Sequence, residues 1–173
     1  MLSIERNLTE AIIAFGQRAV ILRPLFAFFG NIAGYLMIGV FIVSIFRMTS
    51  FKLKSYYFML AALSVIISRG VITETINFLI PTDRPFKVFG LQPVNAIDPG
   101  FPSGHMALFV PIALVAYSYD KRLGRIFLIG TVLMGVSRIL LGYHFPSDII
   151  GGIIVGVAGF FAAKAILPKN ISK

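Results

Sequence analysis

The sequence lacks cysteine and tryptophan altogether, and among its 173 residues only two are histidine and seven are acidic. The absence of cysteine excludes disulfide bonds and thiol chemistry, although it leaves the redox compartment of the protein open. Charged residues of both signs make up only 13% of the chain, against 57% hydrophobic residues. A mean hydropathy of +0.88 is too high for a water-soluble domain. The low content of charged residues and the high mean hydropathy therefore indicate an integral membrane protein.

Apolar runs recur along the chain, and several approach or exceed the roughly 20 residues needed to cross a bilayer core of about 30 Å. The length suits one domain, residues 1–173. We expect an all-α membrane bundle over residues 24–168, preceded by an amphipathic helix within residues 1–22 that lies in the membrane interface. Charge, proline or glycine bounds each of about five expected spans, at 24–46, 56–80, 103–118, 123–142 and 146–166.

Small residues in the last expected span have a spacing typical of helix–helix contacts. They are Gly151, Gly152, Gly156 and Gly159. Such a pattern serves either close packing inside the bundle or a dimer face. We expect the packing role, and the oligomeric state is left open.

Basic residues outnumber acidic ones, which gives a formal net charge of +9. In a membrane protein this excess reflects anionic lipid and cytoplasmic loops, so no nucleic-acid partner is expected. One side of the expected topology holds nine of the basic residues: Arg47, Lys52, Lys54, Lys121, Arg122, Arg125, Lys164, Lys169 and Lys173. By the positive-inside rule that side is cytoplasmic. The loop 81–102 and both histidines then face the periplasm or exterior of a bacterial cytoplasmic (inner) membrane.

The start of the sequence, MLSIERNLTE, carries acids where a secretory signal peptide has basic residues. We therefore expect no cleavable signal peptide.

Both histidines adjoin the same tripeptide, in FPSGH at 101–105 and in HFPSD at 144–148. Proline suits the first position of a helix, so each tripeptide predicts a helix start. The first turn after Pro102 offers the Ser103 hydroxyl, the unpaired N–H groups of Gly104 and His105, and the positive end of a helix dipole, which together favour an anion. After Pro146, the Asp148 carboxylate can reach back to His144 and orient its ring as a nucleophile or base.

Two arginines flank these helix starts on the same side of the membrane. Arg138 falls in the last turn of the span at 123–142, and Arg84 follows the span at 56–80. A guanidinium fork suits phosphate oxygens, two hydrogen bonds at a time. Each residue by itself is typical of a membrane interface. Charged residues are costly inside a membrane bundle, so several of them gathered at one end predict a functional site. The arginines, histidines and helix start together predict that this site transfers phosphoryl groups.

These residues resemble the three-part signature of the type 2 phosphatidic acid phosphatase superfamily. The matching pieces are RP at 84–85, PSGH at 102–105 and SRILLGYHFPSD at 137–148. The resemblance implies that His144 attacks phosphorus and forms a phosphohistidine, while Asp148 orients it. It further implies that His105 protonates the leaving oxygen and later activates water, and that Arg84, Arg138, Ser103 and Gly104 hold the phosphoryl group. It implies no metal and no other cofactor.

One position departs from the family pattern. The first motif normally begins with lysine, and this chain has Asn77 there. Lys87 is a candidate replacement, because its long side chain can point back over the pocket. The interpretation of Lys87 as an ordinary solvated loop lysine has equal weight. Arg69 and Glu74, inside the second expected span, form either a structural pair or a substrate contact, and the structural pair is expected.

The expected function is removal of phosphate from a membrane lipid at the outer face of the membrane. Members of the family act on undecaprenyl diphosphate, lipid A 1-phosphate or phosphatidylglycerophosphate, and the sequence does not choose among them. The expected partners are thus the lipid substrate and the bilayer. The alternative is a non-catalytic protein that binds or transports lipid phosphates in the same basic pocket. No inverted repeat of the kind found in transporters is visible.

Overall fold

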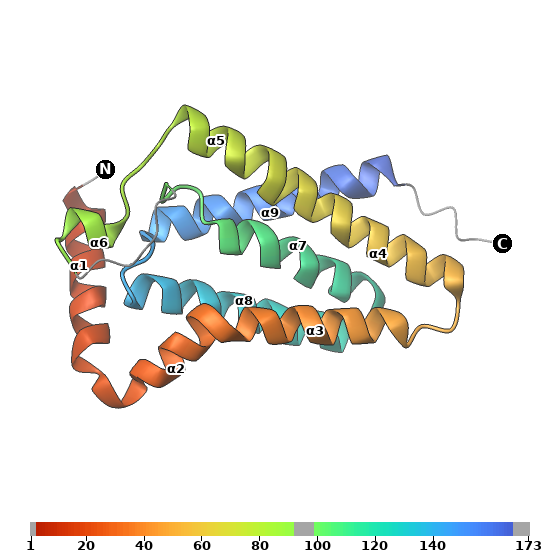
Figure 1. Cartoon of the computed structure of the whole chain (residues 1–173), viewed down its shortest axis with the longest axis horizontal. Helices are drawn as coiled ribbons and strands as arrows, with labels where there is room; N and C mark the ends of the chain where they lie inside the picture. The colour runs from red at the N-terminus through yellow and green to blue at the C-terminus, as the bar shows by residue number, and fades with distance from the viewer. Residues whose placement is uncertain (1–2, 92–98, 168–173) are drawn as a thin grey trace.

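The computed structural model describes residues 3–91 and 99–167, and within these residues the regular structure is entirely helical (Figure 1). Helix α1, Ser3–Arg18, lies across one end of a bundle of longer helices. Glu5 in its first turn and Arg18 in its last turn complement the helix dipole. Its buried side includes Thr9 and Ile13, so this helix is packed onto the bundle end as well as amphipathic.

Within residues 3–91 and 99–167, four helical runs are long and apolar enough to cross a membrane: Val20–Phe46, Phe51–Leu79, Lys121–Leu140 and Pro146–Ile166. The first contains η1 (Val20–Leu22), α2 (Arg23–Ala27), η2 (Phe28–Ile32) and α3 (Ala33–Phe46); the second contains α4 (Phe51–Val65), η3 (Ile66–Thr73) and α5 (Glu74–Leu79). The last two are α8 and α9. The short helix α6, Pro85–Val88, follows the second run.

Local sequence explains where these helices begin. Asp120 caps α8 by accepting from the backbone N–H groups of Arg122 and Leu123, at 2.8 and 3.0 Å. Pro146 occupies the first turn of α9, as the repeated tripeptide predicts.

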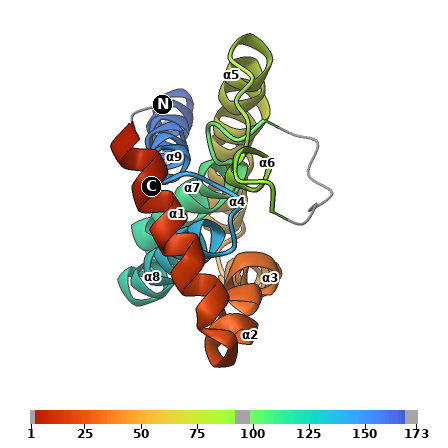
Figure 2. The same ribbon diagram turned by 90° about the vertical axis from the view of Figure 1, so that its left-hand side faces the viewer.

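The remaining expected span is α7, Gly104–Tyr119, which has 16 residues. At 1.5 Å per residue it is about 24 Å long, shorter than a full bilayer core. It packs against both α8 and α9, and Met106, Ala107, Ala113 and Ala116 are fully buried. Figure 2 shows it near the centre of the bundle, where α4 also packs against it. A central helix of this kind faces protein rather than lipid, so it does not need the length of a lipid-exposed span.

The glycines of α9 serve packing inside the bundle. A Cβ at Gly152 would lie 2.5 Å from the Ser103 carbonyl oxygen, and one at Gly156 would lie 2.8 Å from Cβ of Val110. Both contacts are with α7 or the residue that caps it.

The outer surface of the bundle is apolar and exposed, as at Ile21 and Phe78. A surface of this kind suits lipid contact.

Candidate active site

A cavity of about 340 Å³ opens at the end of the bundle that α1 crosses. It is bordered by the two π-helical segments η2 and η3, by the segment before α6, and by the start of α7 and the end of α8. Its described lining is Gly30, Asn31, Gly34, Tyr35, Ile38, Arg69, Asn77, Arg84, Pro99, Pro102, Gly104, His105, Leu108, Phe109, Met134, Arg138 and His144. Three arginines and both histidines are thus gathered there, and none of these described lining residues is a carboxylate.

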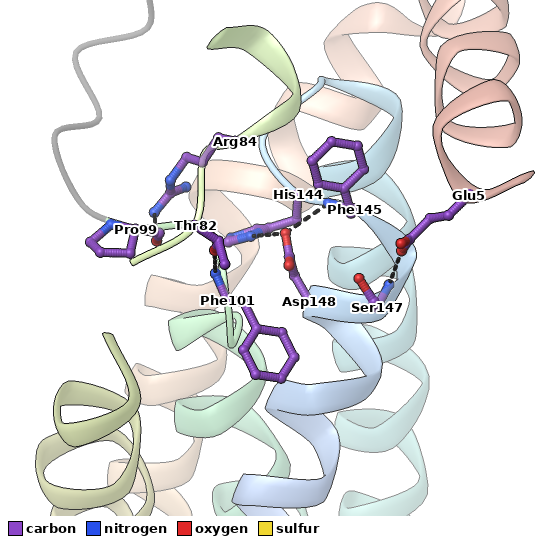
Figure 3. Close-up of polar contacts among 9 residues, drawn as sticks. All are labelled: Glu5, Thr82, Arg84, Pro99, Phe101, His144, Phe145, Ser147 and Asp148. Carbon is purple, nitrogen blue, oxygen red and sulfur yellow. Dashed lines mark hydrogen bonds and ion pairs between the residues drawn. The ribbon is translucent and has the colours of Figure 1, made fainter. Parts of the chain in front are cut away.

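The His144 ring faces Asp148 across the start of α9 (Figure 3). His144 Nδ1 lies 3.3 Å from Asp148 Oδ2, and the same oxygen accepts the backbone N–H of Phe145 at 2.8 Å. Both side chains are almost fully buried. A carboxylate can only accept, so Nδ1 carries the hydrogen and Nε2 keeps its lone pair. This arrangement can present a nucleophilic nitrogen to the cavity.

Burial lowers the pKa of His144 below its ordinary value of 6.5, because desolvation disfavours the imidazolium ion. The hydrogen bond that His144 Nδ1 donates to Asp148 opposes this effect, whereas the positive charges of Arg84 and Arg138 add to it. The ring is therefore neutral at physiological pH, which is the form that retains a lone pair.

A pH profile tests this charge state. A reaction that needs neutral His144 slows as the pH falls through the lowered pKa, so we expect an acid limb of kcat/KM below about pH 6.5. Asp148→Asn removes the carboxylate that raises this pKa. We expect its acid limb at lower pH than that of the wild type, together with a loss of about 10²–10⁴ in rate. Profiles for both proteins on one substrate check this. A limb that moves to higher pH would contradict the assignment.

Arg84 and Arg138 approach the cavity from different elements. Arg84, the residue before α6, is mostly buried and donates from Nη2 to the Pro99 carbonyl at 3.2 Å. The segment before it is held by Thr82, whose Oγ1 accepts the backbone N–H of Phe101 at 2.8 Å. These contacts, drawn in Figure 3, fix the approach of the Arg84 guanidinium.

Arg138 is held by η2 and by an aromatic ring. Its Nη1 lies 3.4 Å from both the Gly30 carbonyl and Asn31 Oδ1, and its guanidinium carbon lies 4.1 Å from the centre of the Tyr143 ring. Its Nε is buried and has no hydrogen-bond partner among residues 3–91 and 99–167. This donor is therefore available to an anion.

The start of α7 contributes His105 and Gly104 to the cavity lining, but not Ser103. The Ser103 side chain is fully buried, and its Oγ has no hydrogen-bond partner in the described part of the chain. Its backbone N–H donates to the Asp148 carbonyl at 2.9 Å. Ser103 thus ties the start of α7 to the start of α9, next to the predicted phosphate site.

Of the two expectations for Lys87, the structure favours the ordinary solvated lysine. Lys87 is exposed, pairs with Asp83 at 2.9 Å and is absent from the described cavity lining. Asp83 lies four residues before it, so the pair is a local one. Asn77 does line the cavity, and its Oδ1 is buried without a hydrogen-bond partner among the described residues. It supplies no charge.

Arg69 was expected to form either a structural pair with Glu74 or a substrate contact. The pair with Glu74 is present, and Arg69 also lines the cavity, so both alternatives stay open. The one available signal was an arginine inside an apolar span, which is costly unless it faces a cavity or a partner. The sequence did not show which of these it faced.

Comparison with known proteins identifies the family. The profile of the PAP2 superfamily matches residues 57–172, more than half of the chain. The chain therefore belongs to the PAP2 superfamily. This confirms the resemblance to the type 2 phosphatidic acid phosphatases and the assignment of the chain to the membrane phosphatases.

Curated relatives carry several names. Bacitracin transport permease protein BcrC of Bacillus licheniformis is 28% identical over 160 residues, which cover 89% of this chain and 76% of that protein. Putative undecaprenyl-diphosphatase YbjG of Escherichia coli K12 is 32% identical over 98 residues, 55% of this chain and 50% of its own length. Lipid A 1-phosphatase of Rhizobium etli is 26% identical over 169 residues, which cover 91% of this chain and 68% of that protein.

The crystal structure of LpxE from Aquifex aeolicus has the same fold. Its TM-score with this chain is 0.73 at 22% identity, and the match covers 95% of this chain and 96% of that one. The all-α membrane architecture is thereby confirmed.

Proposed function

We propose that the protein removes phosphate from a membrane lipid phosphate or diphosphate through a phosphohistidine intermediate. The observation that carries this proposal is the buried His144–Asp148 pair, at 3.3 Å, facing a cavity with three arginines and a second histidine. The lowered pKa favours the neutral form of His144, and Asp148 orients that neutral ring with Nε2 free to attack.

In the first step, His144 Nε2 attacks phosphorus and the bond from phosphorus to the lipid oxygen breaks. His105, at the start of α7, gives its proton to the departing oxygen, so the lipid leaves as a neutral alcohol or as a lipid monophosphate. Arg84, Arg138 and the N–H groups of the first turn of α7, at Gly104, stabilise the charge on the transferring phosphoryl oxygens.

In the second step, neutral His105 takes a proton from water as that water attacks the phosphohistidine. The bond between phosphorus and His144 breaks, and inorganic phosphate leaves. Both histidines return to their starting states. Every group in this cycle is a side chain or backbone N–H of the chain, and we propose that no metal ion is required.

The lipid nature of the substrate is supported by the apolar part of the cavity lining. The lining includes Tyr35, Ile38, Leu108, Phe109 and Met134, and such side chains suit the apolar part of a lipid. Undecaprenyl diphosphate, lipid A 1-phosphate and phosphatidylglycerophosphate are the candidates that family membership favours. Two relatives are named for the first two of these substrates.

A panel of lipid phosphates tests the function. Purified protein in detergent, with a chelator present, is offered the three lipids, and released inorganic phosphate is measured. Release from at least one lipid supports the proposal and ranks the substrates. Saturable binding without any release would instead support a non-catalytic lipid-binding protein.

We also propose that the active-site end faces the exterior of the bacterial cytoplasmic membrane. The opposite end carries Arg47, Lys52 and Lys54 around the turn between α3 and α4, and Arg122 and Arg125 near the start of α8. Such basic ends are cytoplasmic by the positive-inside rule.

Single-cysteine variants test this orientation, because the chain has no cysteine of its own. Val88→Cys lies in α6 at the active-site end, and Lys52→Cys is exposed at the other end. We expect an impermeant maleimide to label Val88→Cys in intact spheroplasts and Lys52→Cys only after lysis. The reverse pattern would place the active site on the cytoplasmic side.

A further inference from the structure

The phosphate site still lacks the cation that the family's first motif supplies. Asn77 occupies that position and is neutral, while Lys87 lies outside the cavity, paired with Asp83. A phosphate group brings close to two negative charges, and a diphosphate brings more. Arg84 and Arg138 offset part of this charge. Among the described lining residues, Arg69 is the one further lysine or arginine.

Arg69 is placed by the π-helical segment η3 rather than by a regular helix. Its neighbour Ser68 is fully buried, with Oγ 2.7 Å from the carbonyl oxygens of both Ser64 and Ala107. The Thr73 hydroxyl donates to the Ser68 carbonyl at 2.9 Å. The bond to Ala107 attaches the widened turns to α7, whereas the other two lie within the same helical run. Segments of this type often occur at functional sites.

The start of α7 makes room for the Arg69 side chain. A Cβ at Gly104 would lie only 2.7 Å from Arg69 Nε, so a larger residue there would displace the guanidinium. Arg69 therefore rests against the first turn of α7, whose backbone carries the positive end of the helix dipole. A cation at that end is electrostatically unfavourable unless an anion joins it.

Glu74 is the anion that joins it in this structure. The Arg69–Glu74 pair is not enclosed by the bundle, with 36% and 55% of the two side chains exposed. Its contact runs from Arg69 Nη1 to Oε1 of Glu74, one oxygen of the carboxylate. A phosphate dianion offers a guanidinium two charge-assisted hydrogen bonds and more charge than a carboxylate. Phosphate can therefore displace Glu74.

We propose that Arg69 is the third phosphate-binding cation, in place of the lysine that Asn77 replaces, and that the substrate phosphate displaces Glu74 from it. This inference rests on the proposed function for the identity of the ligand. It assigns the Arg69–Glu74 pair a role in substrate binding rather than in holding η3 and α5 together.

Phosphate binding by the full chain in detergent tests the proposal without requiring turnover. We expect Arg69→Gln to raise the Kd for inorganic phosphate about tenfold, and Arg69→Lys to recover most of that loss. Arg125→Gln removes the same charge at the far end of α8 and serves as the matched control, with an unchanged Kd. In assays of lipid hydrolysis, Arg69→Gln should raise KM more than it lowers kcat.

A double-mutant cycle tests the exchange with Glu74. Because Glu74 competes for Arg69, Glu74→Gln should lower the phosphate Kd about threefold in the wild-type background, and should have much less effect beside Arg69→Gln. If the pair is purely structural, Arg69→Gln and Glu74→Gln should lose the same thermal stability. Their phosphate Kd values should then lie within about twofold of the Kd of Arg125→Gln. That result would overturn the inference.

Two outcomes separate this inference from the proposed function. If lipid hydrolysis proceeds but Arg69→Gln binds phosphate as the wild type does, only the role of Arg69 is wrong. If phosphate binding depends on Arg69 but no lipid phosphate is hydrolysed, the role of Arg69 stands and the proposed reaction fails. Should Arg69→Gln not fold, Glu74→Gln retains Arg69, and an unchanged phosphate Kd for that variant would contradict the exchange.

Discussion

His144→Ala is expected to reduce lipid phosphate hydrolysis by on the order of 10⁴-fold or more, because it removes the atom that bonds to phosphorus. The arginines and the start of α7 remain, so substrate binding should change far less than turnover. Phosphate release measured with both proteins on the best lipid of the panel checks the size of the loss.

Chemical trapping identifies the intermediate independently of the variant. Wild-type protein quenched during turnover should carry phosphate that is labile in acid, and peptide mapping should place it on the fragment with His144. His144 is almost fully buried, so the thermal unfolding of His144→Ala must be compared with that of the wild type. A folded His144→Ala protein with near-normal turnover would exclude the proposed mechanism.

His105→Gln is expected to lower the rate by about 10²–10⁴, as is typical when a general acid is removed. The loss should depend on the leaving group, because an acid helps most when the departing oxygen is strongly basic. With a phosphate ester of an acidic phenol, His105→Gln should therefore lose much less of the wild-type first-step rate than with a phosphate ester of a lipid alcohol. Rates of product release for a series of leaving groups, measured with both proteins, check this dependence.

The same variant tests the second role proposed for His105. Without a base to activate water, phosphohistidine should persist longer, so a good leaving group should give a burst of product followed by slow turnover. The wild type is the control for the burst. An equal loss for good and poor leaving groups, with no burst, would show that His105 only binds the phosphoryl group.

The sequence determined those features that depend on residues close together in the chain. Hydropathy and turn-forming residues located the helical runs, because the cost of placing polar groups in lipid depends on local composition. Pro146 marked a helix start through the geometry of a single turn. The approach of Asp148 to His144 was also predictable, because four residues across a helix start bring the two side chains together.

The tertiary structure decided which other residues join this pair. Lys87 follows Arg84 by three residues, yet it is exposed beside Asp83 and does not line the described cavity. Arg69 precedes Arg84 by fifteen residues, yet it lines the cavity beside Gly104. Its place depends on the widened turns of η3 and on the bond from Ser68 to Ala107. These contacts join segments far apart in the chain, and their geometry arises only when α7 packs against η3, so no local pattern can encode it.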